Sequence, residues 1–266
     1  MFAPEVQRRN PEIEAAINLA LVAAREREPS RNYLGASRWG HHCERALGYE
    51  YFKTPRDNPS QPKFPADLYS VFDMGHDAEA RLADYLRLAG FDLQTHGPDG
   101  KQIGFTALDG RLGGHCDGII HAGPGITKAP LVWECKALND KSWNDTASKG
   151  VKVSKPVYYA QMQTYIAYMD LKGFLFTARN RDTGELYVEL GESDYRCAQE
   201  LSDRAMRVVE ASGPESLPRC SSVETDHRCR FCDYAKRCWA KAEPKPERAK
   251  TFSGIKFVLG DNNRKQ

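Results

Sequence analysis

Apolar residues recur at helical spacing in three segments of the chain. The first covers residues 11–28 and begins after Asn10, whose side chain can cap a helix. The second covers residues 72–86, and the third, residues 156–169, opens with a proline, which suits the first turn of a helix. We therefore predict three helices, of which the first packs on the core. The polar, proline-containing residues 54–63 are predicted to form a loop.

The run Leu-Val-Trp-Glu-Cys-Lys at residues 131–136 has the pattern of a buried strand. Side chains alternate faces along a strand, so Glu134 and Lys136 share one face. Asp117 closes a neighbouring strand-like run, and Gly118 after it allows a turn or close packing. Charged residues also alternate on many solvated strands, but this run is too apolar for an ordinary surface strand, and buried charges need a partner. The pattern favours a site for a metal ion.

An Asp followed by Glu-x-Lys is expected of a site that holds a divalent metal through oxygen atoms and keeps an ammonium group beside a phosphate. We expect Asp117 and Glu134, with the backbone carbonyl of Cys135, to bind one Mg²⁺ or Mn²⁺. Glu79, on the second predicted helix, would complete that shell or hold a second ion. Lys136 would orient the attacking water or stabilise the negative charge of the transition state.

Two further motifs lie on the predicted helices. Glu79 follows Gly75 by one turn, and Tyr165 follows Gln161 by one turn. Residues four apart lie on one face of a helix, so Gln161 and Tyr165 can reach the same ligand. We expect them to contact the DNA backbone or to position Lys136, the alternative being two polar residues on an exposed face.

The four motifs, in this order, resemble those of the PD-(D/E)XK nuclease superfamily, specifically its RecB-like branch. They are Gly75-x-x-x-Glu79, Gly114-His115-Cys116-Asp117-Gly118, Glu134-Cys135-Lys136 and Gln161-x-x-x-Tyr165. The resemblance covers about residues 65–190 and implies an α/β fold with a restriction-endonuclease-like core. In that fold, helices flank a central mixed sheet with the site at one end, and the implied reaction is hydrolysis of phosphodiester bonds. One departure is Glu79, because many members carry His there.

The chain has eight cysteines. It shows neither a secretory signal peptide nor an apolar run long enough to span a bilayer, so we expect a reducing, cytoplasmic location and no membrane partner. The cell would be bacterial or phage-infected. In such a compartment, thiols serve metals more often than disulfides. Cys116, Cys135 and Cys197 are expected to be packed thiols.

Cys229, Cys232 and Cys238 form a C-x2-C-x5-C array. Three thiols need a fourth ligand, because tetrahedral zinc and cubane iron-sulfur clusters are both normally closed by four. Cys220 would make a local zinc knuckle, whereas Cys43 would make a long-range link across the core. The residues alone leave both choices open.

The choice of Cys43 resembles the four-cysteine nucleases of the AddB and CRISPR-associated type, whose opening motif is similar to Ser37, Cys43 and Arg45. This resemblance implies a structural 4Fe-4S cluster, with Zn²⁺ as the alternative. Its ligands would be Cys43, Cys229, Cys232 and Cys238. Because such a link joins distant parts of the chain, metal binding would contribute directly to folding.

The formal net charge is only +2, so the overall charge does not indicate a nucleic-acid partner. Basic and aromatic residues do alternate between the predicted strand and the third helix. Lysines neutralise phosphates and aromatic rings stack on bases, which suits a groove for single-stranded or frayed DNA. The alternative is a solvated, flexible loop. The residues are Lys141, Trp143, Lys149, Lys152, Lys155 and Tyr158.

We expect a nuclease core at residues 61–215, preceded by a helical region at 1–60 that carries one cluster cysteine. A cysteine element at 216–240 would be clasped to that N-terminal region, and residues 241–266 would form a basic tail. Since there is no Walker-type phosphate loop, any ATP-driven helicase, or a recombinase, would be a partner chain.

The sequence thus predicts a metal-dependent DNA exonuclease, or a combined exo- and endonuclease, of recombination, repair or phage DNA processing. One alternative is a catalytically inactive DNA-binding or adaptor subunit with the same fold. Another is a zinc-bearing RNA-processing nuclease. Cleavage polarity, strand preference and oligomeric state stay open at this stage.

Overall fold

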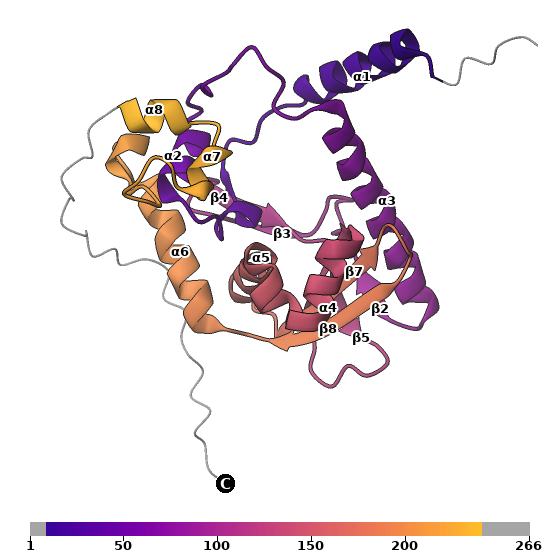
Figure 1. Cartoon of the computed structure of the whole chain (residues 1–266). Coiled ribbons are helices and arrows are strands. Elements are labelled where there is room, and N and C mark those ends of the chain that lie inside the picture. The colour runs from indigo at the N-terminus through magenta and orange to yellow at the C-terminus, as the bar shows by residue number, and fades with distance from the viewer. Residues whose placement is uncertain (1–8, 241–266) are drawn as a thin grey trace, which may run out of the picture.

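The computed structural model describes residues 9–240 and builds them around a five-stranded sheet (Figure 1). The strands, in spatial order, are β2 (Asp92–Gln94), β5 (Gly118–Ala122), β6 (Leu131–Leu138), β7 (Gly173–Asn180) and β8 (Leu186–Glu192). β6 and β7 are parallel, and the other neighbours are antiparallel. The fold is therefore α/β with a mixed sheet, as predicted. The predicted basic tail at 241–266 lies outside the described residues.

β6 and β7 form the buried middle of this sheet. Most residues of both strands are buried, and parallel strands covered on both faces require such continuous apolar runs. The crossover between them passes through α4 (Asp140–Ser154) and α5 (Pro156–Tyr168). The strand predicted over 131–136 lies within β6, and the third predicted helix coincides with α5.

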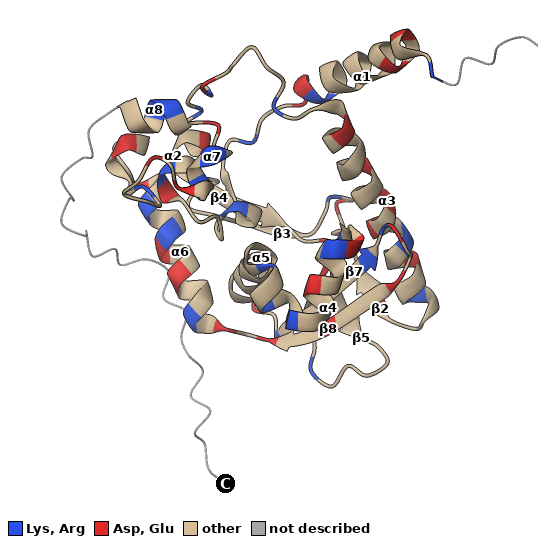
Figure 2. Cartoon of the chain, in the orientation of Figure 1, with Lys and Arg blue, Asp and Glu red and all other residues tan. Residues whose placement is uncertain are grey.

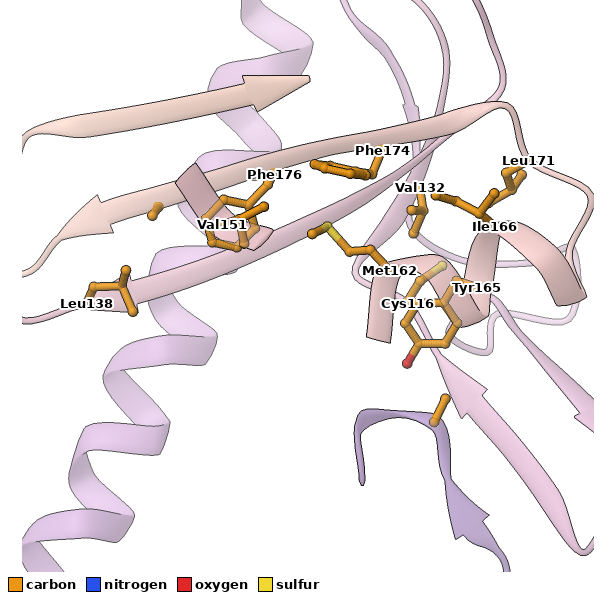
Figure 3. Close-up of a cluster of buried hydrophobic side chains, with 12 residues drawn as sticks. Cys116, Val132, Leu138, Val151, Met162, Tyr165, Ile166, Leu171, Phe174 and Phe176 are labelled. Carbon is orange, nitrogen blue, oxygen red and sulfur yellow. The ribbon is translucent and has the colours of Figure 1, made fainter. Parts of the chain in front are cut away.

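Helices cover both faces of the central strands. On one face, Leu82 of α3 (Ala66–Leu88) packs in a cluster with Trp133 of β6. On the other face, Met162 of α5 packs in a cluster with Val132 (Figure 3). β6 is thus held between two hydrophobic layers, which fixes the direction of its polar side chains.

A smaller three-stranded sheet leads into the first charged residue of the predicted site. Its strands, in spatial order, are β1 (Leu34–Gly35), β4 (Leu112–His115) and β3 (Gly104–Ala107). β1 is parallel to β4, and β3 is antiparallel to it. The 3₁₀ turn Ala36–Arg38 follows β1, and α6 (Tyr195–Val209) follows β8. The segment predicted as a separate helical region at 1–60 therefore contributes a strand to the core.

Early and late parts of the chain meet at a group of short helices. These are α2 (Glu44–Tyr51), the 3₁₀ turn Pro214–Ser216, α7 (His227–Arg230) and α8 (Ala235–Ala240). The Asp57 carboxylate accepts the backbone N–H groups of Lys236 and Arg237 at 2.7 and 3.1 Å. The rings of Tyr49 and Tyr234 stack at 4.9 Å. The predicted contact between the N-terminal region and the cysteine element is present in the structure.

The first predicted helix forms as α1 (Pro11–Glu26), and the Asn10 side chain caps it. However, α1 has no buried residue, and Ile13 and Ile17 are 59 % and 62 % exposed. Its contact with the body includes an ion pair from Arg25 to Asp73 of α3. The expectation that this helix packs on the core was wrong, because its apolar stripe faces solvent.

Charged side chains are mixed over the surface. Along α6, basic and acidic residues follow one another (Figure 2). This distribution agrees with the small net charge of +2. No helix in the described part of the chain is long and apolar enough to cross a membrane.

Candidate active site

Asp117 lies in the link between β4 and β5, and the pairing of β5 with β6 brings it to Glu134. In that antiparallel ladder, Gly118 faces Trp133. The register therefore places Asp117, which precedes Gly118, opposite Glu134, which follows Trp133. The backbone N–H of Cys135 donates to Asp117 Oδ2 at 2.7 Å. A Cβ at Gly118 would lie 3.0 Å from a backbone oxygen of β2, so the glycine permits close packing, as predicted.

Glu134 and Lys136 share one face of β6, as their spacing predicted. Glu134 is fully buried, and its second oxygen accepts the side-chain amide of Gln161 at 3.0 Å. Lys136 Nζ donates to Glu134 Oε1 and, at 2.8 Å, to the carbonyl of Cys135. The same Nζ lies 3.8 Å from Asp117 Oδ2. Two carboxylates and one carbonyl therefore surround a single ammonium group.

Glu79 reaches this group from α3. Burial, followed by the charge of Asp117, raises the pKa of Glu79 to about 7. Burial and Asp117 also raise the pKa of Glu134. Burial alone would lower the pKa of Lys136, but the charges of Glu134 and Asp117 outweigh it and raise that pKa. The lysine is thus held as a cation, and its single positive charge does not offset the burial and the charge of Asp117 that raise the pKa values of Glu79 and Glu134.

Gln161 and Tyr165 lie together on α5, but they hold different parts of the site. Gln161 positions Glu134 rather than Lys136. The hydroxyl of Tyr165 donates to the carbonyl of His115 at 2.6 Å, two residues before Asp117. Both side chains are buried. They therefore form part of the structure behind the acids, and the alternative of an exposed polar face on this helix was wrong.

Two cavities open on the acids. One, of about 600 Å³, has a polar lining that includes Arg31, Arg87 and Gln161. The other, of about 1030 Å³, includes Lys136 and Tyr158. Both are also lined by the same three residues, which are His76, Glu79 and Asp117. Glu79 and Asp117 thus stand where the two cavities meet, whereas the fully buried Glu134 lines neither cavity.

The sequence reasoning missed His76. It lies three residues before Glu79 on α3, and residues three apart share a helix face, so the spacing could have indicated it. It missed Arg31 and Arg87 as well, because they come from separate segments and no local pattern links them to the acids.

The donor set fits a hard divalent cation. Carboxylate and carbonyl oxygens are the ligands that Mg²⁺ and Mn²⁺ prefer. The oxygens of Asp117, Glu134 and Cys135 already face one positive centre, Lys136 Nζ. With Glu79, three acidic side chains share the single ammonium group of Lys136. In their present arrangement, however, no three His, Cys, Asp or Glu side chains of residues 9–240 form a group that could hold a metal ion.

Of the predicted DNA-binding residues, Lys141, Trp143, Lys149 and Lys152 lie on α4 and Lys155 follows its end, so the alternative of a flexible loop was wrong. Lys149 and Lys155 pair with Asp145, and Lys152 pairs with Asp194. The indole of Trp143 donates to the Ala178 carbonyl at 3.0 Å, which holds it against β7. Tyr158, at the start of α5, lines the larger cavity, which the others do not. DNA binding by Lys141 and these residues stays a prediction.

Five cysteines line a third cavity, of about 430 Å³, between α2 and the C-terminal helices. They are Cys43, Cys220, Cys229, Cys232 and Cys238. Cys220, which the sequence left unassigned, interacts with both Cys43 and Cys229, and burial followed by Cys43 raises its pKa to about 12. The two choices for a fourth ligand therefore lie in the same place. All eight cysteines are free thiols, and Cys116 and Cys135 are buried, as expected.

Comparisons with known proteins give a likeness of fold. No family profile and no curated protein matches the sequence. Among solved structures, an alkaline exonuclease from Laribacter hongkongensis (LHK-Exo) is similar, with a TM-score of 0.47 and 17 % identity over 72 % of this chain and 90 % of that one. The structure of LHK-Exo in complex with dAMP has a TM-score of 0.46 and 16 % sequence identity, and the match covers 72 % of this chain and 90 % of that one. The structure of SSO0001 is similar with a TM-score of 0.47 and 17 % sequence identity, and the match covers 88 % of this chain and 98 % of that one.

Proposed function

We propose that this chain is a metal-dependent deoxyribonuclease that hydrolyses phosphodiester bonds, acting as an exonuclease or as a combined exo- and endonuclease. The observation that supports it best is the convergence of Asp117, Glu134 and the Cys135 carbonyl on one cationic centre. Asp117, with Glu79, lies where two cavities meet. A polymer can lie across such a site, whereas a small substrate would need one enclosed pocket.

In this proposal, Asp117, Glu134 and the Cys135 carbonyl hold one Mg²⁺ or Mn²⁺, and Glu79 completes its shell or holds a second ion. A bound divalent cation lowers the pKa of a water molecule and neutralises charge on the phosphate. Lys136, whose ammonium group lies beside these oxygens, would then face the scissile phosphate. There it orients the attacking water and stabilises the negative charge of the transition state.

The remaining residues keep this arrangement in place. Gln161 holds Glu134 by one oxygen, and the Cys135 N–H holds Asp117 by one oxygen, so each carboxylate keeps a second oxygen for a metal ion. Tyr165 holds the backbone at His115. Because these bonds come from buried groups, the acids need little reorganisation before reaction.

We also propose that the cysteine cavity holds a structural 4Fe-4S cluster through Cys43, Cys229, Cys232 and Cys238, with Zn²⁺ as the alternative. Five thiols around one cavity of about 430 Å³ support a soft metal there. Elemental analysis and the visible spectrum of anaerobically purified protein distinguish iron and sulfide from colourless zinc.

The proposed setting is the cytoplasm of a bacterial or phage-infected cell, in recombination, repair or phage DNA processing. A helicase or recombinase partner would supply unwinding, since the sequence has no Walker-type loop. Co-purification of such an ATPase with the tagged chain would test this part separately from cleavage.

The test of the proposed activity is cleavage of end-labelled single- and double-stranded DNA and RNA, with and without Mg²⁺ or Mn²⁺. We expect DNA cleavage that requires the metal, and a loss on the order of 10²–10³-fold or more in Asp117→Asn. Asp170→Asn is the matched control, because the Asp170 side chain is 91 % exposed. A folded protein that cleaves none of these substrates would refute the proposal, and cleavage of RNA alone would favour the RNA-processing alternative.

A further inference from the structure

Aromatic side chains line the cavity of about 1030 Å³ on one side of the acids. Phe64, Tyr69 and Phe72 come from the start of α3 and the segment before it, and Tyr158 comes from α5. The smaller cavity on the other side has Arg31, Arg87, Thr95 and His96 instead. The two sides of the acid site therefore offer different chemistry to a bound polymer.

Three of the rings meet edge to face. Phe64 lies 5.7 Å from Tyr69 and 5.3 Å from Phe72, at interplanar angles of 82° and 86°. Tyr69 and Phe72 lie 6.2 Å apart at 82°. In each edge-to-face pair the edge of one ring contacts a face of the other, so only the outward faces of the group remain for stacking, and Phe72 is the most exposed of the three residues. Tyr69 is buried and anchors the group, whereas Phe72 is 38 % exposed.

The aromatic group is on the same helix face as the acid site. Phe72, His76 and Glu79 are spaced by four and three residues along α3, which places them in one row. Seven residues of helix span about 10 Å, so the Phe72 ring lies a short way along a strand whose phosphate reaches Glu79. Lys63 Nζ lies 5.4 Å from the centroid of the Phe64 ring and supplies a positive charge beside it.

From this arrangement we infer that the cavity is a stacking site for the bases of an unpaired DNA strand, with Phe72 and Phe64 as the platforms. The inference rests on the proposed function and names the form of its substrate. Inside a duplex, neighbouring base pairs cover each other's faces, whereas unpaired bases can turn outward and stack on side chains one after another. Lys63 then contacts the phosphate backbone of the stacked strand.

Binding of a fluorescently labelled single-stranded oligo-dT, followed by anisotropy in Ca²⁺ without Mg²⁺ or Mn²⁺, tests the site apart from catalysis. Phe72→Leu keeps an apolar side chain but removes the ring, and we expect it to weaken binding roughly five- to a hundredfold. Phe64→Leu should act in the same direction. Tyr85→Leu is the matched control, because Tyr85 is on the same helix, 51 % exposed, and lines neither cavity at the acids.

An oligonucleotide with abasic residues in place of its bases provides the second measurement. The unaltered protein should bind it as weakly as Phe72→Leu binds oligo-dT, and Phe72→Leu should hardly distinguish the two. Equal affinity of the unaltered protein for both strands would overturn the stacking site, as would tighter binding of the matched duplex or unchanged oligo-dT binding by folded Phe72→Leu and Phe64→Leu. These results would leave cleavage untouched, whereas stacking without cleavage of any substrate would overturn only the proposed activity.

Discussion

The acid site and the cysteine cavity differ in what holds their buried polar groups. At the acid site, Glu134 and Asp117 accept hydrogen bonds from Gln161 and the Cys135 N–H, on strands at the centre of the sheet. The cysteine cavity rests on a small hydrophobic cluster of Tyr49, Tyr234 and Cys238, with Cys232 and Trp239 beside it. The Tyr49 hydroxyl and the Trp239 indole N–H are buried without a hydrogen-bond partner.

This difference separates two ways of building a site. The sheet positions the acids whatever is bound, because apolar layers on both sides stabilise β6. The cysteine cavity has few apolar contacts, and a buried polar group left unpaired is costly. We therefore expect that loss of a ligand affects stability mainly at the cysteines, and that changes at the acids affect chemistry.

The largest effect on stability is expected from Cys229→Ala. In the proposed cluster, loss of one thiolate ligand should release the metal, so the variant should be colourless and unfold on the order of 10 °C lower, because metal binding would contribute to folding. Cys197→Ala is the control, since Cys197 lies on α6 outside the cavity. Thermal unfolding with metal analysis measures both, and a soluble, fully active and equally stable Cys229→Ala protein would contradict the role of the cysteines.

A smaller effect is expected from Arg45→Met, which changes a buried contact beside the same cavity. Arg45 is 1 % exposed, and it donates to the Leu217 carbonyl at 2.7 Å and to Cys238 Sγ at 3.9 Å. An unpaired buried carbonyl costs about 1–3 kcal/mol, or a lowering of the melting temperature by a few degrees. Arg196→Met, at a 90 % exposed side chain, should change little. Equal melting temperatures for the two variants would show that the cavity does not depend on Arg45.

The smallest effect is a pH dependence at the acid site. Folded Glu79, with a pKa of about 7, keeps its proton at pH values where the unfolded chain, near 4.5, has lost it. Without divalent metal, this acid therefore supports stability at low pH, and that support is lost as pH rises from 4.5 through 7. Between pH 5 and 8, the melting temperature of the unaltered protein should fall by a few degrees more than that of Glu79→Gln.

Both proteins are measured in the presence of a chelator, and the difference between them removes the contribution of the other titrating groups. One of these is His41, because burial lowers its pKa to about 4. Addition of Mn²⁺ at pH 8 should raise the melting temperature of the unaltered protein more than that of Glu79→Gln. Parallel melting curves for the two proteins over this pH range would show that Glu79 titrates normally and that the acid group is not short of positive charge.

The elements of the fold could be predicted where the pattern is local. The strand 131–136 alternates within six residues, and the helices over 72–86 and 156–169 repeat within a few turns, so β6, α3 and α5 were predicted correctly. The parallel pairing of β6 with β7 was not predictable, because strand register depends on contacts that no single segment carries. The exposure of α1 was missed for a related reason, since an apolar stripe does not say whether anything covers it.

The residues of the site also divide into those predictable from a local pattern and those that depend on contacts between distant segments. The shared face of Glu134 and Lys136 follows from the strand period alone. The bond from Gln161 to Glu134 joins residues 27 apart, and Cys220 meets Cys43 only after the chain folds back across the core. The aromatic cavity could not be predicted either, because its lining residues, such as Phe64 and Tyr158, come from segments that are far apart in the sequence.

The contact between α2 and the C-terminal helices has a consequence for biosynthesis. Cys43 emerges from the ribosome almost two hundred residues before Cys238, and at about 5–20 residues per second that interval lasts roughly 10–40 seconds. The sheet with its acids is synthesised within this interval, before the late cysteines appear. The nascent chain can therefore form the strands that carry the acids before Cys43 has the late cysteines as neighbours.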